Sequence, residues 1–144
     1  MIFRLGTKED IPLLENAIER IPTLTKEDVL LYLNCPYRLL YVLEDENKPV
    51  GFLSLTLEGA EAELDDIAIL EENEGKGYGQ FLLKSASEDL RRKEIQTLFL
   101  EVRKSNVKAI RLYENNGFLS YRERKNYYLS PIEDAVCYRK ELFS

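Results

Sequence analysis

The sequence predicts one α+β domain, residues 1–144, built on a mixed but mostly antiparallel sheet flanked by helices. Three observations predict this class. The chain has 144 residues with 44% hydrophobic content, which suits one compact domain. Strand-like segments follow one another in the middle of the chain, as in an antiparallel meander. Strand-like and helix-like segments alternate in the second half, so the sheet is expected to be mixed.

The first 36 residues predict a strand followed by two helices. Residues 1–5 have the character of a strand, and Thr7–Asp10 has the spacing of a capping box. Apolar residues then recur at helical spacing until Pro22 ends the helix. Thr25–Asp28 offers a second cap, and Cys35-Pro36 closes the second helix. The apolar residues of the first helix are Ile11, Leu14, Ala17, Ile18 and Ile21.

The next three segments predict consecutive antiparallel strands. They cover residues 39–43, 50–57 and 62–70. The turn-like residues 46–49 separate the first two, and Glu58-Gly59 separates the second from the third.

Beyond residue 73 the predicted helices and strands alternate. Asn106 is placed to cap a helix, and Gly117 is placed to stop it, because glycine tolerates the left-handed turn that helix ends often require. The expected elements are a helix from the turn 74–79 to Lys93-Glu94, a strand over 97–102, a helix between Asn106 and Asn116-Gly117, and strands over about 118–123 and 135–142.

The composition excludes several kinds of chemistry. The chain has no histidine, which removes serine-histidine and cysteine-histidine nucleophile systems, histidine-ligated metals and a histidine general base. Proton chemistry must therefore use carboxylates, tyrosines, lysines or thiols, and no metal site is expected. The net charge of −6 argues against nucleic acid as a partner.

The charge is also unevenly distributed. Residues 1–72 carry 6 basic and 16 acidic side chains, and residues 73–144 carry 14 basic and 10 acidic ones. This division suits a site with two sides of opposite charge, although a solvated acidic surface explains it equally well.

The cysteine count and the lengths of the apolar runs indicate the cellular compartment in which the protein is expected. Cys35 and Cys137 are too few for a disulfide framework or a zinc ribbon. The first residues lack the pattern of a signal peptide, and no apolar run approaches the roughly 20 residues that span a bilayer. We expect a cytoplasmic protein without membrane contact, as a monomer or weak dimer.

A glycine-rich turn between a strand and a helix is the first candidate binding feature. Helix N-terminal amides have no partners inside the helix, and glycines let a phosphate approach them. The turn is not a P-loop, because Gly77 follows Lys76 where Ser or Thr is required. It is not a Rossmann fingerprint either, because its strand follows a meander. Three glycines before a helix are also often only a flexible turn.

Several short motifs in this order carry a resemblance to a known family. Over roughly residues 50–142 the chain resembles the GNAT acetyltransferases, and within them the RimI type, the ribosomal-protein-alanine N-acetyltransferases. The motifs are Ile67-Ala68-Ile69, residues 74–79, residues 100–106, Leu112-Tyr113-Glu114, Asn116-Gly117-Phe118, residues 124–128 and Glu133-Asp134-Ala135.

The resemblance implies that the chain binds acetyl-CoA. The backbone of a bent strand would receive the pantetheine, the amides of the glycine turn would hold the pyrophosphate, and Asn106 would both cap its helix and contact the coenzyme. Glu74 departs from the family, which usually has Gln or Arg there, and a carboxylate beside a pyrophosphate is unfavourable unless it points to solvent. The implied coenzyme-binding residues are Ile67, Ala68, Ile69, Gly75, Lys76, Gly77, Tyr78, Gly79, Gln80 and Asn106.

Two glutamates are candidates for the general base. Acetyl transfer needs a deprotonated amine, and a carboxylate must supply this function in a chain without histidine. Glu101 interrupts an apolar strand, where it either faces solvent or, by the resemblance, acts as the base through water. Glu63 is the auxiliary candidate, with a structural and a catalytic interpretation equally open. Regular alternation would place Glu63 and Asp65 on one face and Leu64 and Asp66 on the other.

Three tyrosines complete the candidate site. Tyr113 resembles the family's general acid, which protonates the coenzyme thiolate, although a core aromatic is the alternative. Tyr127 and Tyr128 resemble the tyrosine pair that lines the peptide entrance of N-terminal acetyltransferases. Adjacent strand residues point to opposite sides, so at most one of this pair is expected in the core.

Together these features predict an acetyl-CoA-dependent N-acetyltransferase that acts by direct transfer in a ternary complex. The expected acceptor is the N-terminal α-amine of a protein, with a ribosomal protein as the candidate that the resemblance implies. A small-molecule amine such as a polyamine or aminoglycoside is the alternative acceptor. A third interpretation, which Glu74 supports, is an acetyl-CoA-binding module without catalysis.

Overall fold

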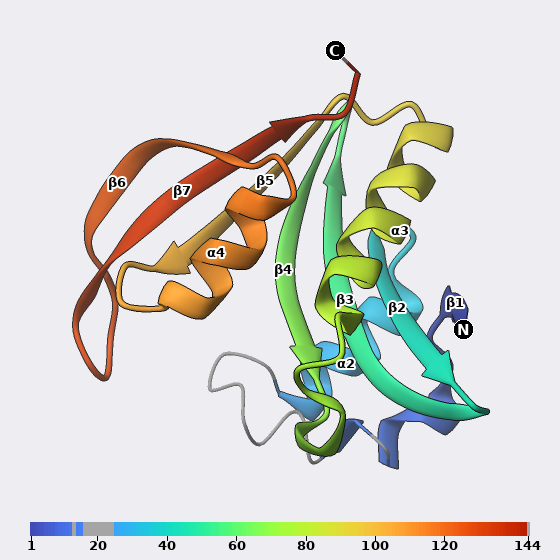
Figure 1. Ribbon diagram of the computed structural model, residues 1–144. Helices are drawn as coiled ribbons and strands as arrows, with labels where there is room; N and C mark the ends of the chain where they lie inside the picture. Colours follow the sequence, from blue (N-terminus) through green and yellow to red (C-terminus); the bar gives the residue numbers. More distant parts are fainter. Residues whose placement is uncertain (13, 16–24, 144) are drawn as a thin grey trace.

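The computed structural model describes residues 1–12, 14–15 and 25–143, which form one seven-stranded sheet with helices on both faces (Figure 1). The strand order is β1-β2-β3-β4-β5-β7-β6. Only β4 and β5 run parallel among these neighbours, so the predicted mixed and mostly antiparallel sheet is confirmed. The strands are β1 (Ile2–Leu5), β2 (Arg38–Asp45), β3 (Lys48–Glu58), β4 (Glu61–Ile69), β5 (Thr97–Arg103), β6 (Leu119–Tyr128) and β7 (Glu133–Glu141).

The helices divide between the two faces of the sheet. On one face lie α3 (Tyr78–Arg92) and α4 (Val107–Asn115), whose apolar sides join the main core. The opposite face, beneath β2 and β3, is covered by α2 (Lys26–Asn34). Two short 3-10 helices, η1 (Lys8–Asp10) and η2 (Glu71–Asn73), connect elements at the surface. Within the described residues no helix is both long and apolar enough to cross a membrane.

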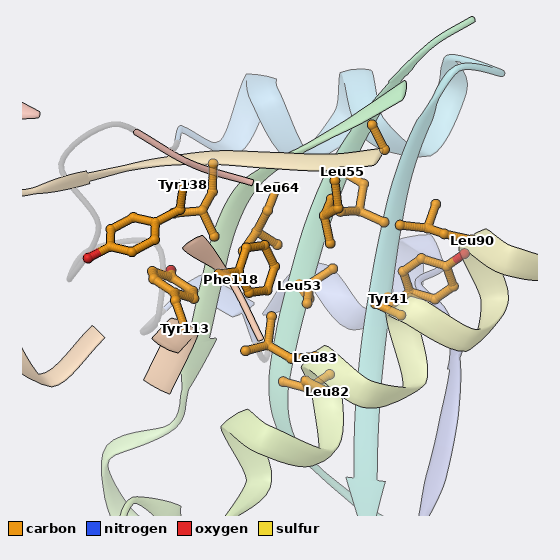
Figure 2. Packing of buried hydrophobic residues seen from close by; sticks show 14 of the residues in the cluster. Tyr41, Leu53, Leu55, Leu64, Leu82, Leu83, Leu90, Tyr113, Phe118 and Tyr138 are labelled. Atoms are coloured by element: carbon orange, nitrogen blue, oxygen red, sulfur yellow. The ribbon is translucent and has the colours of Figure 1, made fainter. Parts of the chain in front are cut away.

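The core follows the alternation of the strands. In β2, Leu40 packs with α2, whereas the next residue, Tyr41, packs with α3 on the other face. Figure 2 shows the main core, where Leu82 and Leu83 of α3 lie against the sheet. Tyr113 of α4 joins this core and meets the Phe118 ring edge-on, with 5.7 Å between the ring centroids.

Both predicted caps at the N-terminal helices are present. The Thr7 amide donates to the Asp10 carboxylate at 2.7 Å, and the Thr25 amide donates to Asp28 at 2.9 Å. The second helix ends at Asn34 with Cys35 as its C-cap, as the Cys35-Pro36 pair predicts. Of the first predicted helix, Ala17, Ile18, Ile21 and Pro22 lie outside the described residues.

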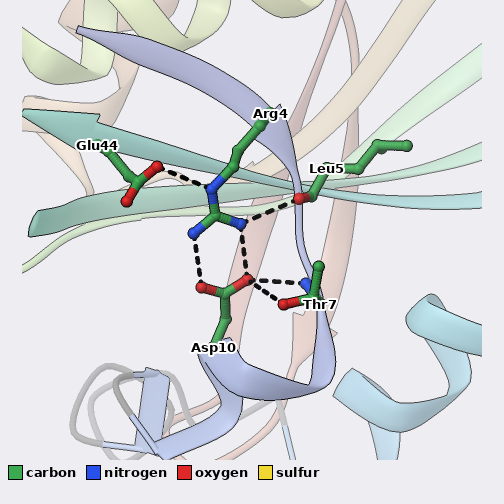
Figure 3. Close-up of polar contacts among 5 residues, drawn as sticks. All are labelled: Arg4, Leu5, Thr7, Asp10 and Glu44. Atoms are coloured by element: carbon green, nitrogen blue, oxygen red, sulfur yellow. Dashed lines mark hydrogen bonds and ion pairs between the residues drawn. The ribbon is translucent and has the colours of Figure 1, made fainter. Parts of the chain in front are cut away.

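A buried ion pair ties β1 to the segment that follows it (Figure 3). Arg4 donates to both oxygens of Asp10 at 2.8 Å and to Glu44 of β2 at 2.9 Å. Asp10 is buried, and its contact with Arg4 holds the pKa of its carboxyl below the usual value. The cluster therefore joins η1 to two neighbouring strands.

The largest difference from the expected elements is the length of β6. The sequence predicts a strand that ends near residue 123, whereas β6 continues to Tyr128. It is the outermost strand beside β7, and its side chains are almost all exposed, so it has no apolar alternation to mark its end.

Candidate active site

The site arises where β4 and β5 separate. The two strands pair only from Glu61 to Glu63, opposite residues 97–99, and beyond that point they diverge (Figure 1). Two cavities of about 540 and 550 Å³ lie along the open edges. Because parallel strands need a crossover, the helix α3 and its glycine turn come to the same end of the opening.

The first cavity lies between the diverging strands, the glycine turn and α4. The end of β4 supplies one wall, and α4 supplies the other. The residues on its surface are Asp65, Asp66, Ile67, Ala68, Ile69, Glu74, Gly75, Gly79, Glu101, Val102, Arg103, Asn106, Lys108, Ala109, Leu112, Tyr113 and Tyr128. The cavity therefore joins Ile67–Ile69, Gly75, Gly79, Asn106 and Tyr113, which the resemblance assigned to coenzyme and catalysis.

The glycine turn has a backbone that only glycine adopts easily. Gly75 and Gly77 have φ values of +79° and +82°, and Gly77 is the N-cap of α3. Gly79 allows close packing, because a Cβ there would lie 3.3 Å from the Leu112 side chain of α4. Asn106 caps α4 by accepting from the Ala109 amide at 3.2 Å. The turn thus presents helix N-terminal amides, with their partial positive charge, beside the cavity.

The other residues predicted around the turn point elsewhere. Lys76, Gly77 and Gln80 are exposed and do not line the first cavity, and the Tyr78 hydroxyl donates to Asp45 at the β2–β3 turn. Lys108 Nζ lies 3.8 Å from the Glu74 carboxylate, so both charges remain at the cavity rim.

Arg103 does not face solvent as a free cation. Its guanidinium donates to the carbonyls of Leu129 and Pro131 at 3.2 and 3.0 Å and pairs with Glu133 at 3.3 Å. It also stacks 4.5 Å from the centroid of the Tyr128 ring. Arg103 therefore anchors the loop between β6 and β7 and holds Tyr128 at the edge of both cavities.

Tyr113 reaches the first cavity from the core. Its side chain is 7% exposed, and burial raises the pKa of its phenol, with Tyr128 and Asp66 adding to the effect. Such a phenol stays protonated near neutral pH and can donate a proton or hydrogen bond into the cavity.

The second cavity opens on the face covered by α2. Its surface residues are Asp28, Tyr32, Arg38, Glu63, Leu64, Asp65, Asp66, Glu101, Tyr127, Tyr128 and Leu129. Five of them are acidic and one is basic, so the cavity suits a cation. Four residues, Asp65, Asp66, Glu101 and Tyr128, line both cavities and mark the place where they meet.

A β-bulge in β4 corrects the expected orientation of Asp65 and Asp66. Ser54 pairs with Asp66 and Leu55 pairs with Leu64, which leaves Asp65 as an extra residue. Ser54 and Thr56 lie on one face of β3, and they donate to Asp66 at 3.4 Å and to Asp65 at 2.6 Å. Both aspartates therefore face the same side, and the alternation that separated them is wrong.

Glu101 and Glu63 both border the second cavity. The Glu101 carboxylate lies 3.3 Å from Arg124 of β6, and its side chain is only 17% exposed, so the solvent-facing alternative does not hold. Partial burial and the neighbouring Asp65 and Glu101 carboxylates raise the pKa of Glu63, which Arg124 partly offsets. The sequence reasoning missed Arg124 as the partner of Glu101.

Tyr127 and Tyr128 also differ from the expected alternation. Both line the second cavity, and their rings meet edge-on with 5.1 Å between centroids. The β6–β7 register shifts between Arg124 and Tyr128, where Asn126 has a φ of +53°, and this irregularity turns both rings to one side. A hydrogen bond to Glu101 raises the pKa of Tyr127 to about 12.

Comparisons with known proteins agree with this arrangement. The family model described as the acetyltransferase (GNAT) family matches residues 11–118. The [ribosomal protein bS18]-alanine N-acetyltransferase of Haemophilus influenzae is 44% identical over 102 residues, 67% of this chain and 69% of that protein. The crystal structure of the ribosomal-protein-S18-alanine N-acetyltransferase from Escherichia coli matches with a TM-score of 0.88 at 27% identity, covering 98% of this chain and 93% of that one.

A third match concerns the coenzyme. An acetyltransferase from Bacillus anthracis, solved in complex with acetyl coenzyme A, matches with a TM-score of 0.69 at 25% identity. The match covers 76% of this chain and 65% of that chain.

Proposed function

The chain belongs to the GNAT acetyltransferase family and is an acetyl-CoA-dependent N-acetyltransferase, and from this premise we propose that its acceptor is the N-terminal α-amine of a protein. The observation that carries the proposal is the meeting of two cavities at four shared residues. One cavity has the amides and apolar wall that a coenzyme needs, and the other has the acidic lining that an ammonium needs. The one sheet runs through both halves of the chain, which supports a single acetyltransferase domain over residues 1–144.

The residues around the first cavity suit the chemistry of acetyl-CoA. We assign the pyrophosphate to the amides of the turn from Gly75 to Gln80, including Lys76, Gly77, Tyr78 and Gly79. The open edge of β4 at Ile67, Ala68 and Ile69 would hold the pantetheine, because its backbone groups are not paired to β5 there. Asn106 would contact the coenzyme from the start of α4. Bound acetyl-CoA supplies the activated acetyl group.

The second cavity fits an amine that arrives as a cation. Its carboxylates attract and orient the ammonium, and Tyr127 and Tyr128 form the wall through which a peptide would enter. The named relatives act on the alanine of a ribosomal protein, which supports a protein N-terminus and a ribosomal substrate for this chain.

The proposed proton transfers use side chains of both cavities. The resemblance implies Glu101 as the base toward the acceptor amine, with Glu63 as an auxiliary carboxylate, and both border the second cavity. Tyr113 donates a proton to the leaving thiolate, a role for which its raised pKa keeps the phenol protonated.

A direct assay tests this function. The protein is incubated with acetyl-CoA and a peptide that begins with alanine, and released coenzyme thiol is measured alongside the acetylated peptide mass. We expect acetylation of the α-amine and none of a peptide blocked at its N-terminus. Acetylation of spermidine or an aminoglycoside, with the peptides untouched, would replace the acceptor by a small amine. Coenzyme binding by calorimetry without acetylation of any amine would reduce the protein to a binding module.

A further inference from the structure

We propose that Asp66 receives the proton from the acceptor ammonium, at the junction of the first cavity, the proposed coenzyme site, and the second cavity, the proposed acceptor site. This assignment rests on the proposed acetyl transfer and gives Asp66 the role of base that the resemblance implies for Glu101. Neither the sequence motifs nor the comparisons single out Asp66. Three observations support it: the position of Asp66 in both cavities, its few hydrogen-bond partners, and the contacts that occupy the other two carboxylates at the junction, Asp65 and Glu101.

The position of Asp66 follows from the bulge in β4. Without the extra residue, Asp66 would point away from the face that Asp65 occupies. With it, Asp66 lines both cavities, where an amine must stand to reach an acetyl group. Its nearness to Tyr113 is visible in the contribution of Asp66 to the raised pKa of that phenol.

The hydrogen-bond partners distinguish Asp66 from its neighbour. One oxygen of Asp65 accepts from both the Tyr32 and the Thr56 hydroxyls at 2.6 Å. Asp66 accepts only from Ser54, at a long 3.4 Å, among the residues that the structure describes. Two short hydrogen bonds therefore occupy the Asp65 carboxylate, whereas the Asp66 carboxylate is left open to a hydrogen bond from an incoming ammonium.

Glu101 is occupied in a different way. Its carboxylate pairs with Arg124 of β6 at 3.3 Å. No described cation pairs with Asp66. An incoming ammonium therefore meets two different carboxylates. The charge of Glu101 is already balanced by Arg124, whereas Asp66 has no described cationic partner.

The groups around Asp66 favour proton uptake. Burial and the adjacent Asp65 raise its pKa to about 6, with a further contribution from Asp28 of α2, while Ser54 acts in the opposite direction. Tyr32 of α2 and Tyr113 of α4 also face it, and Glu101 of β5 lies on the same cavity surface. An α-ammonium, with an ordinary pKa of about 8, yields a proton to such a carboxylate more readily than a lysine-like amine near 10.

The proton balance of the reaction is simple. The ammonium gives one proton to Asp66, and the free amine nitrogen forms the bond to the acetyl carbon. The carbon–sulfur bond breaks, and the thiolate takes a proton from Tyr113. The nitrogen, which carries one proton more than the amide after attack, returns that proton to Tyr113. Asp66 releases its proton to solvent, so one proton is liberated for each amide formed from an ammonium.

The test compares Asp66→Asn and Glu101→Gln with wild type, using the alanine peptide assay from pH 5 to pH 9. In wild type, kcat/KM should rise to a plateau between about pH 6 and pH 8, set by Asp66 and the α-amine. In Asp66→Asn, we expect kcat to fall about 100-fold at pH 7, with the KM for acetyl-CoA changed by less than about 3-fold. The plateau should be replaced by a rise of about tenfold per pH unit up to pH 8, as the free amine becomes available.

Two controls make the outcomes decisive. Glu61→Gln neutralises an exposed carboxylate at the start of the same strand and should match wild type. Thermal unfolding and coenzyme calorimetry show whether Asp66→Asn is folded and binds acetyl-CoA. The assignment would be overturned if Asp66→Asn kept wild-type turnover and the plateau of kcat/KM. It would also be overturned if Glu101→Gln lost that plateau while Asp66→Asn kept it. A wild-type protein that acetylates no amine would overturn the proposed function itself.

Discussion

Asp66 carries a cost in the folded protein that an asparagine at the same position would not. Its pKa is about 6 in the folded state and near 3.8 as an ordinary carboxyl, because burial and Asp65 disfavour its charge. The folded state therefore binds more protons than the unfolded state between these values, and stability falls as pH rises through this window.

A substitution measures this cost. At pH 7, Asp66→Asn should increase the free energy of unfolding by about 1 to 2 kcal/mol, after allowance for solvent screening. Urea unfolding at pH 7 and at pH 4 checks it, because wild type and variant should converge at the lower pH. A variant less stable than wild type at pH 7 would show that the carboxylate supports the fold. Greater stability combined with lower turnover is the pattern of a functional residue.

The ion-pair cluster at β1 and η1 has the opposite dependence on pH. Arg4 keeps the Asp10 carboxylate charged in a buried place and lowers its pKa, so this stability is present above the ordinary carboxyl pKa and is lost as pH falls. Arg4→Met should cost about 2 to 4 kcal/mol at pH 7, because a buried charge is left without its cation. Chemical unfolding provides the measurement, and the loss should shrink toward pH 3. Lys8→Met, which removes an exposed cation nearby, serves as the control and should change stability little.

The glycine turn can be tested with a glycine of similar conformation elsewhere. Gly77 at the start of α3 and Gly59 between β3 and β4 both have positive φ, and a Cβ would meet nothing within 4 Å at either. Alanine at either position should cost about 1 to 2 kcal/mol of stability from backbone strain. Only Gly77→Ala should also weaken acetyl-CoA binding in calorimetry, by several-fold. Equal coenzyme affinity in the two variants would place the pyrophosphate away from the turn.

The elements that the sequence predicted well are those with local signals. Helix caps are signals of this kind, because each acts on backbone groups close by in the chain and is therefore recognisable from a few consecutive residues. They are the capping boxes at Thr7 and Thr25, the Asn106 cap and the helix stop at Gly117. The bulges had no such signal. An extra residue in β4 depends on its pairing with β3, and nothing in the local pattern of acids around Asp65 shows where that pairing shifts.

At the scale of the whole molecule, the uneven charge of the chain is reflected in the two cavities. Four of the five acids around the second cavity come from residues 28–66, whereas Lys108 at the rim of the first cavity comes from the basic half. The acidic lining of the second cavity was therefore predictable from the sequence. The junction of the two cavities was not, because Asp65, Asp66 and Arg124 acquire their places through strand pairing and through the separation of β4 from β5.

The acidic lining of the second cavity, the proposed acceptor site, predicts a preference among substrates. Peptides with a basic second residue should show a kcat/KM about tenfold higher than peptides with an acidic one at low ionic strength. Raising the salt concentration should reduce this ratio, because exposed charges are screened. Peptide competition at 20 mM and 500 mM salt, two concentrations chosen at roughly the extremes of screening, checks this. A ratio that does not change with salt would assign the preference to shape instead of charge.

The bulge in β4 makes the lining of the site sensitive to insertions and deletions as well as to substitutions. In a regular strand only every second side chain faces a given site, whereas the bulge at Asp65 lets two consecutive residues, Asp65 and Asp66, face the same wall. Deleting one residue at the bulge would change the amino-acid composition very little. It would reverse which side chains of β4 after the bulge face the cavities. Evolution can thus change the chemistry of this enzyme by a single-codon deletion or insertion in β4, a route that point substitution alone does not provide.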